Sequence, residues 1–175
     1  MTNIMSPVLC VQTHVILSFV KVLDETMSAF QPRSTKTGGL PNLTWLLRKP
    51  EPLGTEFKTV CCAITGLMTV METQRGRDGM KDIKYNREYG ATAGCTMRLA
   101  EKSSQELYST KDIVVGDAWF GSVTAAANLA AEGKDCCLQV KTNTGFFPKK
   151  FIMDALENGP GGVNIILKGK EFAFF

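Results

Sequence analysis

Runs of apolar residues in the first half of this chain predict three β-strands. Residues 16–23 are almost continuously apolar and rich in β-branched and aromatic side chains, as is typical of a strand buried on both faces. Residues 57–64 and 67–72 form two more apolar runs, and the Thr-Gly pair between them favours a tight hairpin. A Pro-, Gly-, Ser- and Thr-rich stretch at residues 31–42 predicts a loop, and a short apolar run follows at residues 43–47.

The second half of the chain predicts helices that alternate with strands. After a polar, loop-like stretch at residues 76–90, the expected elements are a helix at 91–102, a strand at 113–116, a helix at 122–132, a strand at 136–140, a helix at 148–157 and a further strand at 163–167. Ser122 can cap the second of these helices. The inner face of that helix is expected to carry Val123, Ala126, Ala127 and Ala130.

This order of elements predicts an α/β fold with a mixed sheet. The hairpin makes the second strand antiparallel to its neighbours, and right-handed crossovers through helices make the later strands parallel. The order is that of the ribonuclease H-like fold, in which the first and fourth strands lie side by side and helices flank the sheet. A Rossmann-like doubly wound sheet is the alternative, and the hairpin disfavours it because neighbouring parallel strands need crossover connections.

The composition is that of an ordinary globular chain with one domain. The 175 residues are 44% hydrophobic and 21% charged, which excludes collagen-like, coiled-coil and wholly disordered chains. No apolar run approaches the ~20 residues of a membrane span, so no membrane partner is expected. Residues 1–15 are expected to be a poorly defined N-terminal segment, followed by the domain at residues 16–175.

The six cysteines are predicted to be reduced. They include two adjacent pairs in apolar runs, and neighbours on a strand point to opposite faces, so neither pair can easily bond internally or share a metal. No CxxC motif occurs, and the single histidine, His14, cannot complete a common zinc site.

Positive charge gathers in one segment. The net charge of +3 is too small to indicate a nucleic-acid binder by itself. Residues 31–50, however, contain no acid and four bases, which are Arg33, Lys36, Arg48 and Lys49. Such a patch suits the phosphate backbone of DNA or RNA, although a solvated loop can carry the same four charges. These residues are therefore candidate DNA contacts, with an ordinary surface loop as the alternative.

Two aspartates follow the first and fourth predicted strands. Asp24 comes at the exit of residues 16–23, and Asp117 comes directly after residues 113–116. If these strands are neighbours, both carboxylates reach the same rim of the sheet. Mg²⁺ prefers such oxygen ligands, and two ions can stabilise the attacking and leaving oxygens of a phosphoryl displacement. The chemistry indicated is phosphodiester cleavage or strand transfer; the alternative is that both acids are ordinary solvated residues at strand ends.

Five short segments carry a family resemblance. They are residues 24–33, which begin Asp-Glu-Thr-Met, residues 48–50, 53–58 and 65–67, and residues 116–122, Gly-Asp-Ala-Trp-Phe-Gly-Ser. In this order they resemble the catalytic domain of piggyBac-type DDE transposases, in the IS4-like transposase superfamily, over about residues 16–168. The last segment is similar to a motif usually read Asp-Asn-[Phe/Trp]-Phe-Thr-Ser. Ala118 and Gly121 depart from it, and we expect these departures to cost local hydrogen bonds and to loosen the turn.

The resemblance implies an activity and a set of partners. The activity is DNA cleavage and strand transfer in transposition, dependent on Mg²⁺ or Mn²⁺, with Asp24 and Asp117 as catalytic residues and metal ligands. The implied partner is double-stranded DNA, both transposon ends and a TTAA target. The resemblance also implies a nuclear location and a homodimeric full-length parent.

The family's third catalytic aspartate is not matched in this chain. In the family it lies beyond a segment like residues 163–169, after an insertion. Asp154 and Glu157 are poor substitutes, because helical periodicity turns both away from the apolar side of their helix. We therefore expect a partial domain that lacks the third acidic motif. The alternative to a transposase fragment is a catalytically inactive, transposon-derived module that binds DNA or protein.

Overall fold

The computed structural model describes residues 17–30, 41–104, 112–141, 143–158, 167–168 and 173–174. The strands are β1 (Val20–Ala29), β2 (Leu43–Trp45), β3 (Leu53–Cys62), β4 (Met68–Thr73), β5 (Ile113–Gly116), β6 (Asp135–Leu138), β7 (Leu167–Lys168) and β8 (Ala173–Phe174). The helices are α2 (Gly76–Met80), α3 (Asn86–Ser103), α4 (Val123–Ala131) and α5 (Lys149–Asn158). The segment expected at residues 1–15 and most of the strand expected at 163–167 lie outside the described residues.

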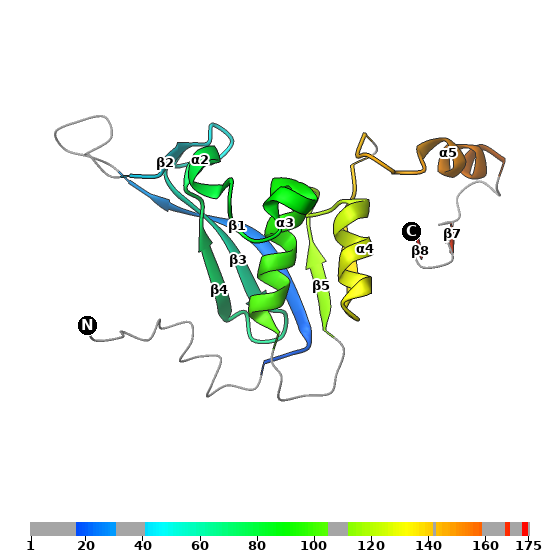
Figure 1. Cartoon of the computed structure of the whole chain (residues 1–175), viewed down its shortest axis with the longest axis horizontal. Coiled ribbons are helices and arrows are strands. Elements are labelled where there is room, and N and C mark those ends of the chain that lie inside the picture. The colour runs from blue at the N-terminus through cyan, green and yellow to red at the C-terminus, as the bar shows by residue number, and fades with distance from the viewer. Residues whose placement is uncertain are drawn as a thin grey trace.

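Six strands of the described ranges form one mixed sheet (Figure 1). β1 pairs antiparallel with β3 on one side and parallel with β5 on the other, and β6 continues the sheet parallel to β5. The far edge of β3 pairs with both β4 and β2, at different heights along the strand. The expected ribonuclease H-like mixed sheet is confirmed, including the adjacency of the first strand and the strand at residues 113–116.

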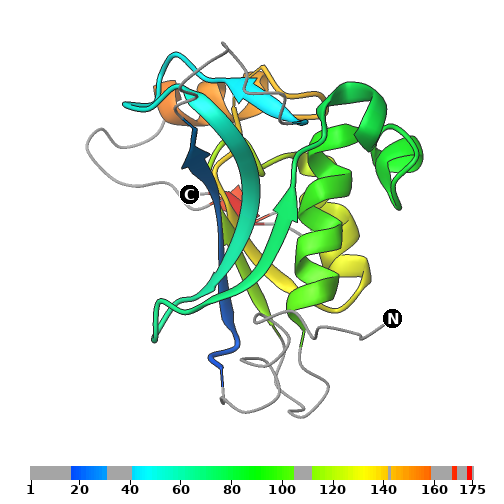
Figure 2. The ribbon, with the colours of Figure 1, turned by 90° about the vertical axis from the view of Figure 1, so that its left-hand side faces the viewer.

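Helices α3 and α4 lie on the same side of the sheet (Figure 2). Side chains alternate along β1, so that Leu23 is buried towards these helices whereas the next residue, Asp24, is exposed on the opposite face. The core between the sheet and the helices includes Leu23, Val60, Val114, Leu99 and Leu129. Burial of this apolar surface, worth roughly 25 cal/mol per Å², is the main force that holds the two layers together.

β1 is longer than the apolar run predicted. It continues through residues 24–29, which apart from Met27 are polar or small, because all of these residues pair with β3, up to Ala29 opposite Gly54. Gly54 permits the close approach: a Cβ atom there would lie 2.2 Å from the carbonyl oxygen of Ser28. The expectation that β1 ends before Asp24 is therefore wrong, because β1 continues beside β3 to Ala29. Only the pairing of β1 with β5 ends at Leu23, directly before Asp24.

The helices match the predicted order but differ in detail. The stretch expected to be a loop at residues 76–90 contains α2 and the first residues of α3, with a break at Gly90, which has φ 81°. In α4 the buried residues are Ala125 and Leu129. Of the four expected inner residues, Ala127 and Ala130 are exposed, and Val123 and Ala126 are half-buried. A leucine buries more apolar surface than an alanine, so Leu129 sets which face of the helix turns inward.

Two expectations about cysteines and membranes can be compared with the described residues. Their five cysteines are all free thiols, in agreement with the predicted reduced state. Adjacent Cys61 and Cys62 differ in burial, as expected for neighbours on a strand. Within the described part of the chain, no helix is both long enough and apolar enough to cross a bilayer.

Candidate two-carboxylate site on the central strands

Asp24 and Asp117 follow the last paired residues of two adjacent parallel strands. The register between β1 and β5 ends with Leu23 beside Gly116, so Asp24 is the next residue of β1 and Asp117 is the first residue after β5. Both side chains are exposed. Because side chains alternate between the two faces of a sheet, Asp24 leaves β1 on the side opposite α3 and α4. The register thus places the two aspartates at matching positions beside adjacent strands, whereas a shared metal site stays a prediction.

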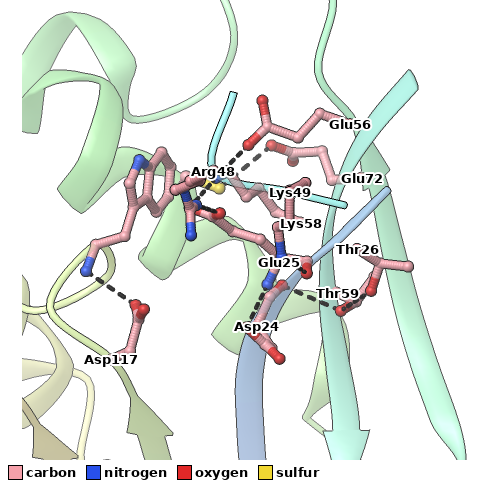
Figure 3. A network of polar contacts seen from close by, with 12 residues as sticks. Asp24, Glu25, Thr26, Arg48, Lys49, Glu56, Lys58, Thr59, Glu72 and Asp117 are labelled. Atoms are coloured by element: carbon pink, nitrogen blue, oxygen red, sulfur yellow. Dashed lines mark hydrogen bonds and ion pairs between the residues drawn. The ribbon is translucent and has the colours of Figure 1, made fainter. Parts of the chain in front are cut away.

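One oxygen of each carboxylate is held by a backbone N–H (Figure 3). Oδ1 of Asp24 accepts a hydrogen bond from the N–H of Glu25 at 2.7 Å. Oδ1 of Asp117 accepts one from the N–H of Trp119 at 2.9 Å, in the turn that leads to α4. Neither Oδ2 atom has a hydrogen-bond partner within the described residues. The two carboxylates are therefore oriented by their own backbone, and each keeps one oxygen for a ligand.

A polar network lies on the helix-facing side of the same strands. Glu25 and Lys58 stand directly opposite each other on β1 and β3, and both side chains are buried. The ammonium of Lys58 donates to Oε1 of Glu25 at 2.9 Å and to Oε1 of Glu56 at 2.7 Å. It also lies 3.4 Å from the centre of the Trp119 ring. The local sequence pattern does not predict this network, because Glu25, Lys58 and Trp119 are far apart in the chain.

The two described residues of the predicted basic patch lie against this network. Arg48 forms an ion pair with Oε2 of Glu25 and remains 62% exposed, and the ammonium of Lys49 donates to the carbonyl oxygen of Glu25 at 3.5 Å. The structure therefore places Arg48 and Lys49 beside the residue that follows Asp24. The other two predicted DNA contacts, Arg33 and Lys36, lie outside the described residues.

The turn after Asp117 is tight. The backbone carbonyl oxygen of Asp117 accepts hydrogen bonds from the N–H groups of Phe120 and Gly121, at 3.1 and 3.0 Å. A Cβ atom on Gly121 would lie 1.9 Å from the carbonyl oxygen of Gln139, so the backbone of this turn approaches the residue after β6 closely. The expectation that Gly121 loosens the turn is wrong, because the missing side chain is what permits this contact.

A second buried ion pair lies beside the network. Glu72 on β4 accepts hydrogen bonds from Nε and Nη2 of Arg98 on α3, at 2.9 and 2.8 Å. The thiol of Cys95 faces the same carboxylate at 3.6 Å. Burial raises the pKa of Cys95 to about 12, so this cysteine is a neutral thiol at physiological pH.

The donor set suits a divalent cation only in part. Two exposed carboxylates are hard oxygen ligands, as Mg²⁺ and Mn²⁺ prefer. In the described part of the chain, however, no group of three or more His, Cys, Asp or Glu residues is placed to hold a metal ion. Asp154 on α5 is exposed, and the side chain of Glu157 lies outside what is described. The residues present therefore provide two ligands of such a site.

Known proteins resemble this chain at two levels. No curated protein matches it in sequence. Its fold is similar to that in "Cryo-EM structure of piggyBac transposase synaptic complex with hairpin DNA", with a TM-score of 0.63 and 18% sequence identity. The match covers 88% of this chain and 29% of that one, so this chain spans less than a third of the length of the transposase it matches. The family model described as Transposase IS4 matches residues 11–164. This chain belongs to that family, as the resemblance of its motifs predicted.

Proposed function

We propose that this chain is part of the DNA-processing core of a piggyBac-type transposase, in which Asp24 and Asp117 bind Mg²⁺ or Mn²⁺. One observation carries the proposal: in a member of the Transposase IS4 family, two exposed carboxylates follow the last paired residues of adjacent parallel strands. The reaction is cleavage of a DNA phosphodiester and strand transfer. The family membership supports the class of reaction, and the register supports the choice of residues.

The residues of this chain would hold the cation and the DNA. Oδ2 of each aspartate is free to bind the ion, because Oδ1 already accepts a backbone hydrogen bond. A bound divalent ion supplies an activated water and neutralises charge on a phosphodiester. Arg48 and Lys49 both contact Glu25, the residue after Asp24, and their charges favour a phosphate backbone. Arg33 and Lys36 belong to the same proposed DNA contact.

The activity of the whole protein needs groups beyond the two aspartates. We infer that a further acidic residue, outside the described ranges, completes the metal site of the parent enzyme. The structure that this chain resembles is a transposase complex with hairpin DNA, which supports double-stranded DNA, both transposon ends and target, as the partner. A nuclear location and a homodimeric parent complete the proposal.

Binding of Mn²⁺ to this chain tests the proposal directly. We expect electron paramagnetic resonance to show one Mn²⁺ bound per chain. Asp24→Asn and Asp117→Asn should each weaken binding by more than ~10-fold, because even the loss of an outer partner of a metal site reaches that range. Glu132→Gln is the matched control, since Glu132 is an exposed acid at the other end of α4. Equal Mn²⁺ binding by all four proteins would refute the site.

A non-catalytic role is the second candidate, and the two-carboxylate donor set favours it. With only two ligands among the described residues, a second metal ion has no complete site, and cleavage loses the stabilisation of one reacting oxygen. The chain would then act as a DNA-binding or protein-interaction module. Retained DNA binding together with absent Mn²⁺ binding would favour this role. Mg²⁺-dependent nicking of plasmid DNA that Asp24→Ala abolishes would exclude it.

A further inference from the structure

We propose that Lys58 is a positioning residue that holds the Asp24 strand and the Asp117 turn in register with each other. The inference rests on the proposed function, because it assigns Lys58 a role in shaping the metal site. Lys58 itself faces the other side of the sheet from Asp24, and its ammonium bonds to neither aspartate.

A continuous series of contacts runs from one aspartate to the other through Lys58 (Figure 3). Asp117 is bonded to the N–H of Trp119, and the Trp119 ring lies under the ammonium of Lys58 at 3.4 Å. The same ammonium donates to Glu25, whose own N–H donates to Asp24. Two segments that are remote in sequence are therefore joined by one side chain on a third strand.

The ammonium group of Lys58 has a partner for each of its three N–H groups. Lysine has three N–H donors and no acceptor. In Lys58 the partners are the carboxylates of Glu25 and Glu56 and the face of the Trp119 ring. A cation over an indole ring is attracted to it, and more strongly when both are shielded from water. A neutral side chain of the same length would fill the space and lose all three attractions.

Stability alone does not explain a charged residue at this position. The Lys58 side chain is 1% exposed, and burial lowers its pKa, although Glu56 opposes this effect. Buried ion pairs are often no more stabilising than apolar residues of similar volume, whereas they do fix the geometry of their partners. The same Glu25 that binds Lys58 also binds Arg48. The network therefore ties the proposed DNA contact to the strand that carries Asp24.

The chain offers a matched control in Lys21. It is also on the sheet and 2% exposed, and it faces the same side as Glu25, but its ammonium donates to the carbonyl oxygen of Ser18 at 2.7 Å. Lys58→Met and Lys21→Met thus remove the same buried charge, and only the first breaks the series of contacts between the two aspartates. An effect on Mn²⁺ binding that comes only from the loss of a buried charge should appear in both variants, so the difference between them reports the loss of the contacts of Lys58.

Two measurements on these variants test the proposal. We expect Lys58→Met to weaken Mn²⁺ binding by about 10- to 100-fold and Lys21→Met to leave it unchanged. The second readout needs no metal: in a Trp45→Phe background, where Trp119 is the remaining tryptophan, acrylamide should quench Trp119 emission faster in Lys58→Met than in Lys21→Met. Should Lys58→Met fail to fold, Glu25→Gln removes the carboxylate charge that attracts the Lys58 ammonium at constant size, and smaller losses in the same direction are expected.

The outcomes separate this inference from the proposed function. If the unaltered chain binds no Mn²⁺ but Lys58→Met exposes Trp119, the metal site is wrong and Lys58 still anchors the turn. If Mn²⁺ binds through Asp24 and Asp117 but Lys58→Met behaves like Lys21→Met in both measurements, the site stands and the positioning role is overturned.

Discussion

Arg98 on α3 donates two parallel hydrogen bonds to the carboxylate of Glu72 on β4, from Nε at 2.9 Å and from Nη2 at 2.8 Å. Both side chains are buried, with 3% and 8% exposed. Arg98 also donates to the carbonyl oxygen of Lys84 and to the side chain of Asn86, at 2.8 and 2.6 Å. The guanidinium of Arg98 therefore links α3 to β4 and to the segment that leads into α3.

We predict that this pair controls stability in acid. Burial alone would raise the pKa of Glu72, but the hydrogen bonds and charge of Arg98 outweigh it and hold the pKa below its ordinary value of 4.5. The folded state therefore binds fewer protons, so the pair's contribution is present above pH 4.5 and is lost as the pH falls through the lowered pKa. Urea unfolding between neutral pH and pH 3 should show a shallower decline for Glu72→Gln than for the unaltered chain.

The same pair should be costly to break at neutral pH. Arg98→Met leaves a buried carboxylate without its main partner, and we expect a loss of about 3–5 kcal/mol of unfolding free energy. Glu101→Gln serves as the control, because the Glu101–Lys84 pair is exposed and solvent screens it, so its loss should change the unfolding free energy little. Similar unfolding free energies for the two variants would contradict this assignment.

Gly121→Ala is predicted to disturb the turn that carries Asp117. Its new Cβ would lie 1.9 Å from a backbone oxygen that has no freedom to rotate away, so the turn or the end of β6 must shift. We expect a loss of about 1–3 kcal/mol, as for other overpacked sites, together with weaker Mn²⁺ binding. Gly145→Ala is the control, because a Cβ atom there meets nothing within 4 Å. Thermal unfolding and Mn²⁺ titration of both variants check the prediction.

Ser122 is predicted to stabilise α4 as its N-cap. Its hydroxyl accepts a hydrogen bond from the N–H of Ala125 at 3.0 Å. Ser122→Ala should cost about 1 kcal/mol, whereas Ser122→Asp, which keeps an acceptor at this position, should cost much less. Chemical unfolding followed by circular dichroism measures both. Equal losses would mean that the hydroxyl does not act as a cap.

Arg48 and Lys49 are predicted to give a salt-sensitive component to DNA binding. Each substitution to Ala should weaken binding to a duplex of any sequence and lower the slope of log K against log salt by about one. Lys134 lies directly before the first residue of β6, at the opposite rim of the sheet from Asp117. Lys134→Gln removes an equal charge there and should leave the slope unchanged. A fluorescence anisotropy titration at several salt concentrations measures the slope. An unaltered slope in Arg48→Ala and Lys49→Ala would show that both charges serve only Glu25.

The sequence predicted those features that depend on local pattern. Apolar runs and the Thr-Gly hairpin predicted the order of elements of a ribonuclease H-like fold, in which β1 lies beside β5, and Ser122 predicted the start of α4. The buried network was beyond local pattern, because Glu25, Lys58 and Trp119 meet only after three segments have been brought together. The polar end of β1 was missed for a related reason. Its residues 24–29 have little intrinsic strand preference, and their partners on β3 determine their conformation.

Among the described strands, β1 has two hydrogen-bonded neighbours before Asp24 and one from Asp24 onwards, so its two parts should differ in stiffness. Residues up to Leu23 have hydrogen-bonded neighbours on both sides, whereas in the described structure the residues that follow pair only with β3. Local opening is easier where fewer backbone contacts must be broken, so the outer part of the strand should bend and exchange its amide hydrogens sooner than the inner part. Asp24 lies at this boundary. The outer part of β1 can then bend while Leu23 and the residues before it stay paired on both sides at the centre of the sheet.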